Sequence, residues 1–387
     1  KNLGNEKITP FVQQLDLELA AIEKGGYEHF MLKEIFEQPK AVADTLLGRL
    51  ENKKIKLDEL NLTSEEIRAL TKIVILACGT AYHAGLIAKY AIEEWAKISV
   101  EVELASEFRY RNPILDKNSL VIAISQSGET MDTLMALRHA KEFGCKVLSI
   151  CNTNSSTIPR ESDAVIYTHA GPEIAVASTK ALLTQIVATF LIGLHLAEVR
   201  GTLNSSEVSS IYNEMLELPS KLEQILETVE PLRELTRKFA DKNTVLFLGR
   251  HVGFPVALEG ALKLKELAYI HAEGFAGGEL KHGPIALIEE GTPVIAIVPN
   301  THEHGLDEKM LSNIQEVRAR GAQVIAIASE GIEIPGAAHV IRIPNSPQML
   351  QPVLATVPLQ VFAYEMACAR GTDVDQPRNL AKSVTVE

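Results

Sequence analysis

The segment that most clearly predicts chemistry is Ser-Gln-Ser-Gly-Glu-Thr at residues 125–130. It follows an apolar run directly and opens a helix-like segment, so unpaired backbone N–H groups at the helix start would face a bound anion. Ser125, Ser127 and Thr130 add hydroxyl groups, and Gly128 allows close approach of the backbone. Because the loop has no lysine, it predicts a site for one phosphate monoester rather than a nucleotide. An ordinary serine N-cap and turn is the alternative interpretation.

A helix-like segment at residues 257–270 carries a second group of reactive side chains. Glu259, Lys263 and Glu266 are spaced by four and by three residues, so they share one helix face. A solvated face with an ordinary ion pair is the simpler interpretation, and spacing alone favours it. The alternative is a buried carboxylate with a raised pKa beside a lysine, a pair that could transfer protons.

Two further residues of suitable type lie in polar segments. His282 lies in a loop-like Glu-Leu-Lys-His-Gly-Pro stretch, where a lone histidine is more often structural than catalytic. Lys382 lies in a polar C-terminal tail that contains Pro377, and a solvated lysine on a frayed end is the ordinary interpretation there. Spacing alone therefore gives neither residue a role.

The elements that would position these residues repeat along the chain. Short apolar runs alternate with helix-like segments, which indicates βαβ units and a parallel sheet. The runs lie at residues 73–77, 120–124 and 147–150, and again at 244–248, 294–297 and 324–327. The second set keeps the order of the first at an offset of roughly 170 to 177 residues, which indicates two copies of one fold. We predict an α/β protein with two doubly wound, flavodoxin-like parallel-sheet domains and helices on both faces.

The predicted organisation has five parts, with the repeat at its centre. They are a helical N-terminal segment (1–70), a first α/β domain (71–201), a helical connector (202–240), a second α/β domain (241–371) and a C-terminal tail (372–387).

The second copy differs from the first where the hydroxyl-rich loop would be. Residues 298–301 read Val-Pro-Asn-Thr, so most hydroxyl groups are missing and Pro299 has no N–H to donate. We expect that this copy has lost the phosphate site and supplies other groups.

Next to this segment, His302 and His304 stand two residues apart without further ligands, which is too little to predict a metal site. We expect neither a metal nor a cofactor.

Composition and charge narrow the class of protein. The chain has 387 residues, 46% of them hydrophobic and 23% charged, as in soluble globular enzymes. No uninterrupted apolar run approaches the ~18 residues of a membrane span, so we expect no membrane. The net charge of −12 argues against nucleic acid as a partner, but it leaves room for a small anion at a locally positive site.

Cysteine usage and the start of the chain predict its cellular context. Cys78, Cys145, Cys151 and Cys368 show no paired spacing of zinc or disulfide type, so we expect reduced thiols and a cytoplasmic protein. The chain begins at Lys1 rather than Met and shows no signal peptide. We interpret it as the back part of a longer polypeptide.

Taken together, these motifs resemble the glucosamine-6-phosphate synthases, which are isomerising glutamine–fructose-6-phosphate aminotransferases. The resemblance runs from about His29 to the last residue. The loop at residues 125–130 is shared by many sugar-isomerase (SIS) domains, whereas the tail Asp-Val-Asp-Gln-Pro-Arg-Asn-Leu-Ala-Lys-Ser-Val-Thr-Val-Glu at 373–387 is far more specific. Further matching segments lie at residues 77–80, 176–180, 257–266 and 278–284.

The resemblance implies the isomerase/synthase portion of such an enzyme, built from two SIS domains. That portion makes glucosamine 6-phosphate from fructose 6-phosphate and ammonia, the first step towards UDP-N-acetylglucosamine. The family's N-terminal glutaminase domain, which releases the ammonia from glutamine, has no counterpart in this chain. We therefore expect sugar isomerase activity without glutamine-dependent synthesis, and a homodimer whose active site is completed across subunits.

The resemblance also implies roles for individual residues. The residues implied to hold the sugar phosphate are Ser125, Gln126, Ser127 and Thr130, and those implied to line the sugar are Thr80, Val176, Ser178 and Ala381. Lys382 corresponds to the family's Schiff-base lysine, Glu266 to its proton-transfer base and His282 to its ring-opening residue, with Lys263 assisting. Ala81 stands where the family often has serine, so one contact with a sugar hydroxyl is expected to be missing.

The chemistry fits these residue types. Histidine titrates near neutrality and suits ring opening, a lysine amine activates a ketone as an imine, and a carboxylate moves a proton between C1 and C2. An imine-forming lysine must be partly neutral, so we expect the tail to fold over the sugar site as a lid.

Two rival functions remain open at this point. The first is a plain phosphosugar isomerase or a sugar-amine deglycase with paired SIS domains, which needs neither ammonia nor a lysine in the tail. The second is a sugar-phosphate sensor that regulates a partner, which could keep the serine-rich loop without Glu266 and Lys382. Because both residues are present, an enzyme is favoured.

Overall fold

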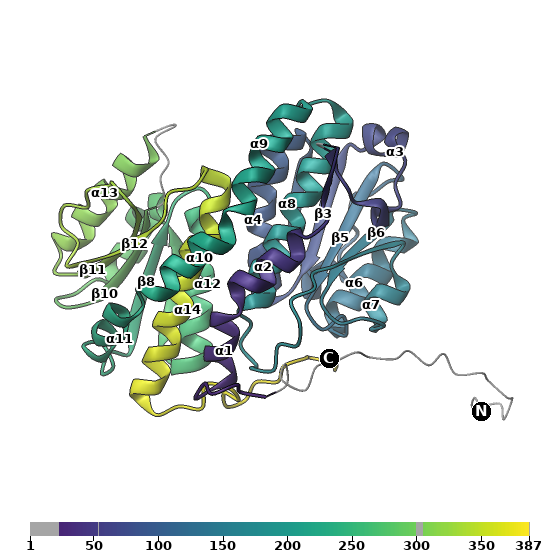
Figure 1. The fold of residues 1–387 in the computed structure, drawn as a ribbon. Helices are drawn as coiled ribbons and strands as arrows, with labels where there is room; N and C mark the ends of the chain where they lie inside the picture. Colours follow the sequence, from purple (N-terminus) through teal and green to yellow (C-terminus); the bar gives the residue numbers. More distant parts are fainter. Residues whose placement is uncertain (1–22, 53, 299–304, 387) are drawn as a thin grey trace, which may run out of the picture.

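The computed structural model describes residues 23–52, 54–298 and 305–386, and it contains two α/β units side by side (Figure 1). The strands of the first sheet are β3 (Lys72–Ala77), β4 (Ser99–Leu104), β5 (Ser119–Ser125), β6 (Lys146–Cys151) and β7 (Ala164–Tyr167). They lie in the order β4-β3-β5-β6-β7, and every neighbouring pair is parallel. β5 is buried at every residue, as an apolar run between two helical layers requires.

The second sheet repeats this arrangement. Its strands are β8 (Thr244–Gly249), β9 (His271–Ala276), β10 (Pro293–Val298), β11 (Gln323–Ser329) and β12 (His339–Ile343). They lie in the order β9-β8-β10-β11-β12, again all parallel. The apolar runs matched by sequence occupy corresponding strands, so the prediction of two copies of a flavodoxin-like α/β fold is confirmed.

Helices cover both faces of each sheet. Those of the first unit are α4 (Gly79–Ala96), α5 (Ala105–Phe108), α6 (Met131–Glu142), α7 (Thr157–Glu161) and α8 (Lys180–Arg200). Those of the second unit are α12 (Gly253–Ala268), α13 (Leu306–Arg318) and α14 (Gln351–Arg370), with 3-10 turns η3 (Gly277–His282), η4 (Pro284–Leu287) and η5 (Gln348–Leu350).

The remaining elements join or flank the two units. The connector consists of α9 (Ser205–Leu216), α10 (Leu218–Glu227) and α11 (Glu230–Arg237). The N-terminal segment contains α1 (Phe30–Phe36), α2 (Gln38–Leu46), β1 (Leu50–Glu51), β2 (Lys54–Ile55), η2 (Asp58–Leu60) and α3 (Ser64–Ala69). α3 begins with a capping box, because the Thr63 hydroxyl accepts from Glu66 N–H and the Glu66 carboxylate accepts from Thr63 N–H. Residues 1–22 of this segment lie outside the described residues.

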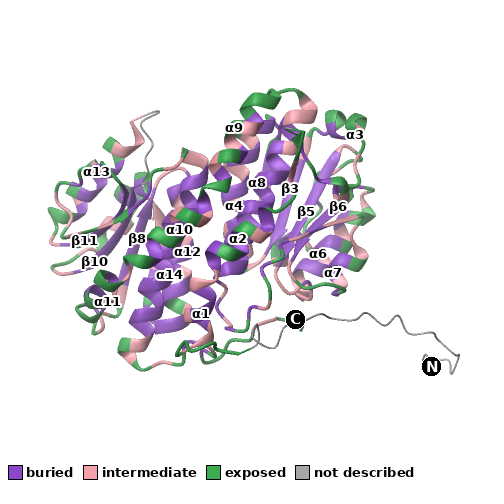
Figure 2. Cartoon of the chain, viewed as in Figure 1, coloured by how far each residue is buried: buried purple, intermediate pink, exposed green. Residues whose placement is uncertain are grey.

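One apolar core continues from the first unit into the second. α4 packs against α12 and α8 packs against α14, so four largely buried helices fill the space between the sheets (Figure 2). By length and composition, α8 and residues 348–370 are apolar enough to cross a membrane. Because 83% of each apolar window is buried inside the protein, we assign both to this core. The shared core fixes the position of α12 relative to the ends of β3 and β5.

Candidate active site

The principal candidate site lies at the carboxyl ends of β3 and β5. The chain leaves β3 towards β4 on one side and enters β5 on the other, and such a switch point is where open α/β sheets bind ligands. A cavity of about 290 Å³ opens there between the two loops. It is lined by Cys78, Gly79, Thr80, Ala81, Ile124, Ser125, Gln126, Ser127, Thr130, Thr133, Glu173, Val176, Ser178, Gln185, Glu266, Leu380, Ala381, Lys382 and Val384.

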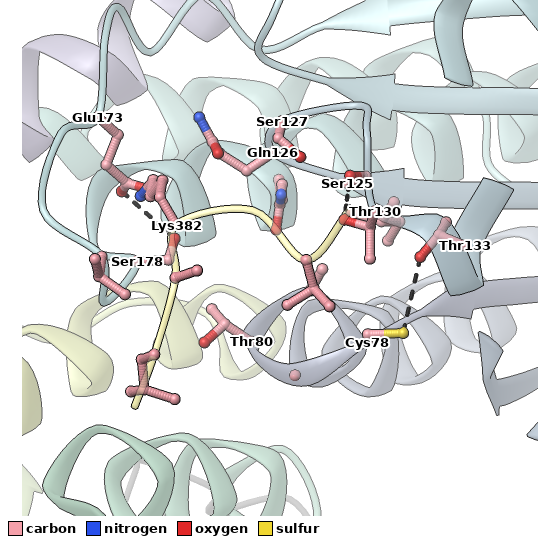
Figure 3. Close-up of a pocket in the computed structure, with 18 of the residues that line it drawn as sticks. Cys78, Thr80, Ser125, Gln126, Ser127, Thr130, Thr133, Glu173, Ser178 and Lys382 are labelled. Atoms are coloured by element: carbon pink, nitrogen blue, oxygen red, sulfur yellow. Dashed lines mark hydrogen bonds and ion pairs between the residues drawn. The ribbon is translucent and has the colours of Figure 1, made fainter. Parts of the chain in front are cut away.

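The hydroxyl-rich loop forms one wall of this cavity (Figure 3). The hydroxyl oxygens of Ser125 and Thr130 lie 3.0 Å apart, and Gly128 N–H donates to Ser125 Oγ at 3.1 Å. Thr130 is the N-cap of α6 but makes no side-chain capping bond. The Ser125 hydroxyl therefore organises the loop itself, immediately before the start of α6.

Gly128 is required by geometry at this turn. Its φ of +66° lies in the left-handed region, and a Cβ there would come within 2.0 Å of Ser156 Oγ. Any side chain would push the loop away from α7, so glycine keeps the donors of the loop in place.

The C-terminal tail closes the cavity from the opposite side. In Figure 3 the tail is the thin pale yellow coil that passes between Glu173 and the loop that contains Ser127. Ser383 Oγ donates to Ser127 Oγ at 2.7 Å, and Met131 N–H, the first of α6, donates to the carbonyl of Val384 at 3.0 Å. The tail is thus fastened to the helix start that the sequence predicts as an anion site.

Lys382 points into the cavity and is held at its Nζ atom. The ammonium donates to Glu173 Oε2 at 2.5 Å and to the carbonyl of Ala175 at 2.7 Å. The other oxygen of Glu173 accepts from Thr179 N–H at 2.8 Å and Ala181 N–H at 3.0 Å. Burial alone would raise the pKa of Glu173, but the Lys382 charge and these backbone donors outweigh it and keep the pKa low. Lys382 is therefore paired with an ionised carboxylate.

The charged face of α12 is buried, so the interpretation of it as a solvated face is wrong. The side chains of Glu259 and Lys263 are each 1% exposed. Lys263 Nζ lies 2.5 Å from Glu266 Oε2 and 3.5 Å from Glu259 Oε1. Burial opposes the charge on Lys263, but Glu266 and Glu259 outweigh it and raise its pKa to about 12. Glu266, which bonds to Lys263, also lines the cavity.

The first unit holds the same cluster through α4. Thr80 Oγ1 donates to Glu259 Oε1 at 3.1 Å, and His83 Nδ1 lies 2.6 Å from Glu259 Oε2. Burial would raise the pKa of Glu259, but Lys263 and His83 overcome it and hold the pKa low. Because an ionised carboxylate only accepts, Nδ1 of His83 carries the proton of this bond.

Most of the predicted site residues come together here, and two do not line the cavity. Lys263 lies behind the cavity wall and reaches it only through Glu266. His282 is exposed at the end of η3, on the second unit, and is absent from the lining of the cavity. The second-copy residues 299–301 and His302 to His304 lie outside the described residues. In the part of the chain that is described, no group of three or more His, Cys, Asp or Glu side chains is arranged to hold a metal ion.

Sequence reasoning missed three residues of the site. Glu173 precedes the Val-Ala-Ser-Thr-Lys motif, and a lone carboxylate among small apolar residues was the available signal. His83 follows Thr80 by three residues on a helix that starts at Gly79, so their shared face was readable from spacing. Gln185 is buried and lines the cavity with an Oε1 atom that lacks a hydrogen-bond partner among the described residues, which no spacing could show.

The cysteine in the cavity, Cys78, lies in surroundings that favour the neutral thiol. Burial raises the pKa of the Cys78 thiol and outweighs the hydrogen bonds that its sulfur accepts, among them a long one of 3.8 Å from the Thr133 hydroxyl. Cys78, Cys145, Cys151 and Cys368 are all free. Cys78 is therefore a small side chain that fills the end of β3, and the reactive groups of the cavity are amine, carboxyl and hydroxyl.

Comparison with known proteins places the chain. The SIS domain family matches residues 66–193 and 238–370. A glutamine–fructose-6-phosphate aminotransferase (isomerizing) from Streptomyces coelicolor is 65% identical over 96% of this chain and 61% of its own length. One from Mycolicibacterium paratuberculosis is 61% identical over 99% of this chain and 62% of its own length. The chain thus spans about three-fifths of the length of the curated relatives it matches.

Solved structures show the same likeness. The C-terminal domain of glucosamine-fructose-6-phosphate aminotransferase from Francisella tularensis has a TM-score of 0.87 and 42% identity, over 92% of this chain and 100% of that one. A glucosamine-6-phosphate deaminase from Thermotoga maritima has a TM-score of 0.68 and 24% identity, over 92% of this chain and 99% of that one. At 24% identity the second likeness shows the fold alone.

Proposed function

The chain belongs to the SIS-domain family and, within it, to the C-terminal portion of the glutamine–fructose-6-phosphate aminotransferases, and from that premise we propose its activity. It binds fructose 6-phosphate in the cavity of the first unit and converts the ketose to an aldose. In the longer protein, ammonia from a glutaminase domain enters the same site, and the product is glucosamine 6-phosphate. The observation that carries the proposal is Lys382, held 2.5 Å from buried Glu173 in a cavity that also contains the hydroxyl-rich loop and Glu266.

The phosphate of the sugar binds at the start of α6. Ser125, Ser127 and Thr130 offer hydroxyl groups there, and the backbone N–H groups of the helix start and its dipole favour an anion. Gln126 completes this set, while Thr80, Val176, Ser178 and Ala381 face the sugar. Ala81 also lines the cavity and has no hydroxyl to offer, which supports the loss of one sugar contact.

The chemical steps follow from the groups around the carbonyl. Lys382 gives up a proton, for which Glu173 is the adjacent acceptor, and the free amine adds to C2 of the open-chain sugar. The carbonyl oxygen leaves as water and an imine remains. Ammonia then adds to C2 and the lysine amine departs, which leaves the imine of ammonia. Glu266 removes a proton from C1 and returns it to C2, and the proton of the C1 hydroxyl passes to the nitrogen, so the ketose imine becomes the amino aldose. Lys263 holds Glu266 in place through the ion pair at 2.5 Å.

Ring opening and assembly form the second part of the proposal. His282 is exposed and lies outside the cavity of its own chain, so we assign it to the cavity of a second copy in a homodimer. Its imidazole opens the sugar ring there as an acid and base. We place this reaction in the cytoplasm, and the free cysteines support that location.

The test separates an enzyme from a sugar-phosphate sensor. The chain is incubated with fructose 6-phosphate, with and without ammonium, and the sugars are identified by NMR and mass spectrometry. We expect glucose 6-phosphate without ammonium, and no glucosamine 6-phosphate when glutamine is the sole nitrogen source. Binding of fructose 6-phosphate without any product would favour the sensor. Product formation that survives Lys382→Arg at full rate would favour a plain isomerase.

A further inference from the structure

Glu34 on α1 is a buried acid that the mechanism above does not use. Its residue is 2% exposed, and one carboxyl oxygen accepts from Ile174 N–H at 2.5 Å and from Ala175 N–H at 3.3 Å. The other oxygen has no hydrogen-bond partner among the described residues. Burying a carboxyl group carries a cost in desolvation free energy. The hydrogen bonds that it accepts here fix the backbone of residues 174 and 175.

The segment that Glu34 grips is the one that holds Lys382. Lys382 Nζ donates to Glu173 Oε2 and to the carbonyl of Ala175. The N–H of Ala175 thus bonds to Glu34, and the C=O of the same residue bonds to Lys382. A shift of residues 173–175 by a fraction of an ångström would therefore move both acceptors of the Lys382 ammonium.

We propose that Glu34 is a positioning residue for Lys382, which it places by holding the backbone of residues 173–175 in position. This inference rests on the proposed function, because it concerns the lysine that forms the imine. It also gives the N-terminal helix α1 a defined connection to the reacting amine.

A second set of hydrogen bonds joins α1 directly to the tail that carries Lys382. The Asp375 carboxylate accepts from Phe30 N–H at 3.0 Å and from Met31 N–H at 2.9 Å, at the start of α1. The carbonyl of Asp375 accepts from Val176 N–H at 3.0 Å. Helix α1, the segment after Glu173 and the tail that carries Lys382 are thus bonded pairwise, so displacement of one displaces the others.

The charges around Glu34 suit this role. The groups that act on it are Glu173, Lys382 and Lys180, the last of which pairs with Glu37 at 2.7 Å. Burial, with the Glu173 carboxylate adding to it, raises the pKa of Glu34 to about 8. Near neutral pH Glu34 is therefore mostly protonated, and it grips the backbone without placing a second negative charge beside the Lys382 ion pair.

The experiment compares Glu34→Ala, Glu34→Asp and Glu34→Gln with Asp44→Asn as the control on the neighbouring helix α2, where Asp44 pairs with the exposed Lys40. Borohydride traps the imine of fructose 6-phosphate on Lys382, and mass spectrometry gives its rate at saturating sugar. Binding of glucose 6-phosphate by calorimetry reports the phosphate loop separately. Acetic anhydride labelling of Lys382 without sugar reports how firmly the amine is held.

We expect Glu34→Ala and Glu34→Asp to slow trapping at least ~10-fold while the Kd for glucose 6-phosphate changes less than ~2-fold. They should also raise labelling of Lys382. Glu34→Gln, whose amide oxygen accepts the same N–H groups, and Asp44→Asn should resemble the wild type. Unchanged trapping and labelling in Glu34→Ala and Glu34→Asp would overturn the inference, as would a loss of phosphate affinity equal to the loss in trapping. Absence of any adduct in the wild type would instead overturn the proposed function, and the labelling would still test the clamp.

Discussion

The imidazole of His83 and the carboxylate of Glu259 lie 2.6 Å apart and join the two α/β units inside one buried charge cluster. His83 belongs to α4 of the first unit and Glu259 to α12 of the second, and Glu259 in turn holds Lys263. The cavity of the first unit therefore receives Glu266 at a position fixed by its own helix α4. Loosening this bond should disturb proton transfer without touching the phosphate loop.

His83→Ala tests this relationship. It leaves one oxygen of buried Glu259 without its donor, which should lower the free energy of unfolding by about 1–3 kcal/mol. Isomerisation should slow roughly tenfold or more, the equivalent of about 1.4 kcal/mol in the barrier, with little change in sugar-phosphate affinity. Urea unfolding and steady-state kinetics measure the two effects. His271→Ala is the control because that side chain is 71% exposed, and an equal effect there would contradict the argument.

Ser127→Ala tests the phosphate site. Because the hydroxyl would contact the phosphate and not the sugar, the variant should weaken binding of every 6-phosphosugar by a similar factor of about ten. Calorimetry with fructose, glucose and glucosamine 6-phosphates measures it. Ser162→Ala, at the C-cap of α7 and absent from the lining of the cavity, is the control. A factor that differs strongly between the three sugars would remove Ser127 from phosphate binding.

Lys382→Arg tests covalent catalysis. Arginine keeps the charge opposite Glu173 but cannot form a stable imine, since its guanidinium stays protonated. Borohydride with fructose 6-phosphate should modify Lys382 alone in the wild type and no residue in the variant, while sugar-phosphate affinity stays within ~3-fold. Peptide mapping by mass spectrometry locates the adduct. An adduct on Lys263, or activity without an adduct in the variant, would exclude Lys382 from the mechanism.

A mixing experiment tests the shared active site. His282→Ala and Lys382→Arg should each be nearly inactive as homodimers, because each lacks one group in both cavities. In a mixed dimer, one cavity combines an intact Lys382 with His282 of the other chain, so roughly a quarter of wild-type activity should return after subunit exchange at equal amounts. Restored isomerisation, followed by NMR, is the measurement. No recovery, with mixed dimers shown by native mass spectrometry, would place His282 outside the neighbour's cavity.

The pH dependence of stability tests the state of Glu34. Its pKa is raised from 4.5 to about 8 on folding, so the folded state binds more protons than the unfolded state between these values. The contribution of Glu34 to the free energy of unfolding is therefore largest below about pH 4.5, and it is lost as pH rises through 8. Relative to Glu34→Gln, the wild-type Tm should fall by at least ~3 °C between pH 6 and pH 9. Parallel Tm curves for the two proteins would show that Glu34 titrates normally.

The fold and part of the site were readable from sequence for identifiable physical reasons. Apolar runs such as 120–124 must be buried on both sides, so they predict parallel strands, and their ordered repetition predicts the second sheet. The loop at 125–130 is local in sequence, so its donors were visible together. The burial of Glu259 and Lys263 could not be predicted in this way, because it depends on α4 of the other unit. Spacing along one helix does not show what covers that helix.

The contact between Lys382 and Glu173 joins residues 209 positions apart, so only resemblance, and no local pattern, predicted a role for Lys382. Glu34 shows the same limit more strongly. A glutamate in a short amphipathic helix has the pattern of a surface residue, and its burial follows from the loop at 173–175 that covers it. Long-range contacts of this kind decide the chemistry of a side chain after the fold has formed.

The attachment of Ser383 and Val384 to the start of α6 has a further consequence for any ligand that binds there. The Ser127 hydroxyl and the Met131 N–H already have partners from the same chain. An anion that takes these donors competes with a tethered segment whose effective concentration is fixed by the length of the tail and is independent of dilution. The measured association constant is then the intrinsic one divided by one plus the equilibrium constant with which the tail occupies these donors. The tail thereby sets the ligand concentration at which the site fills.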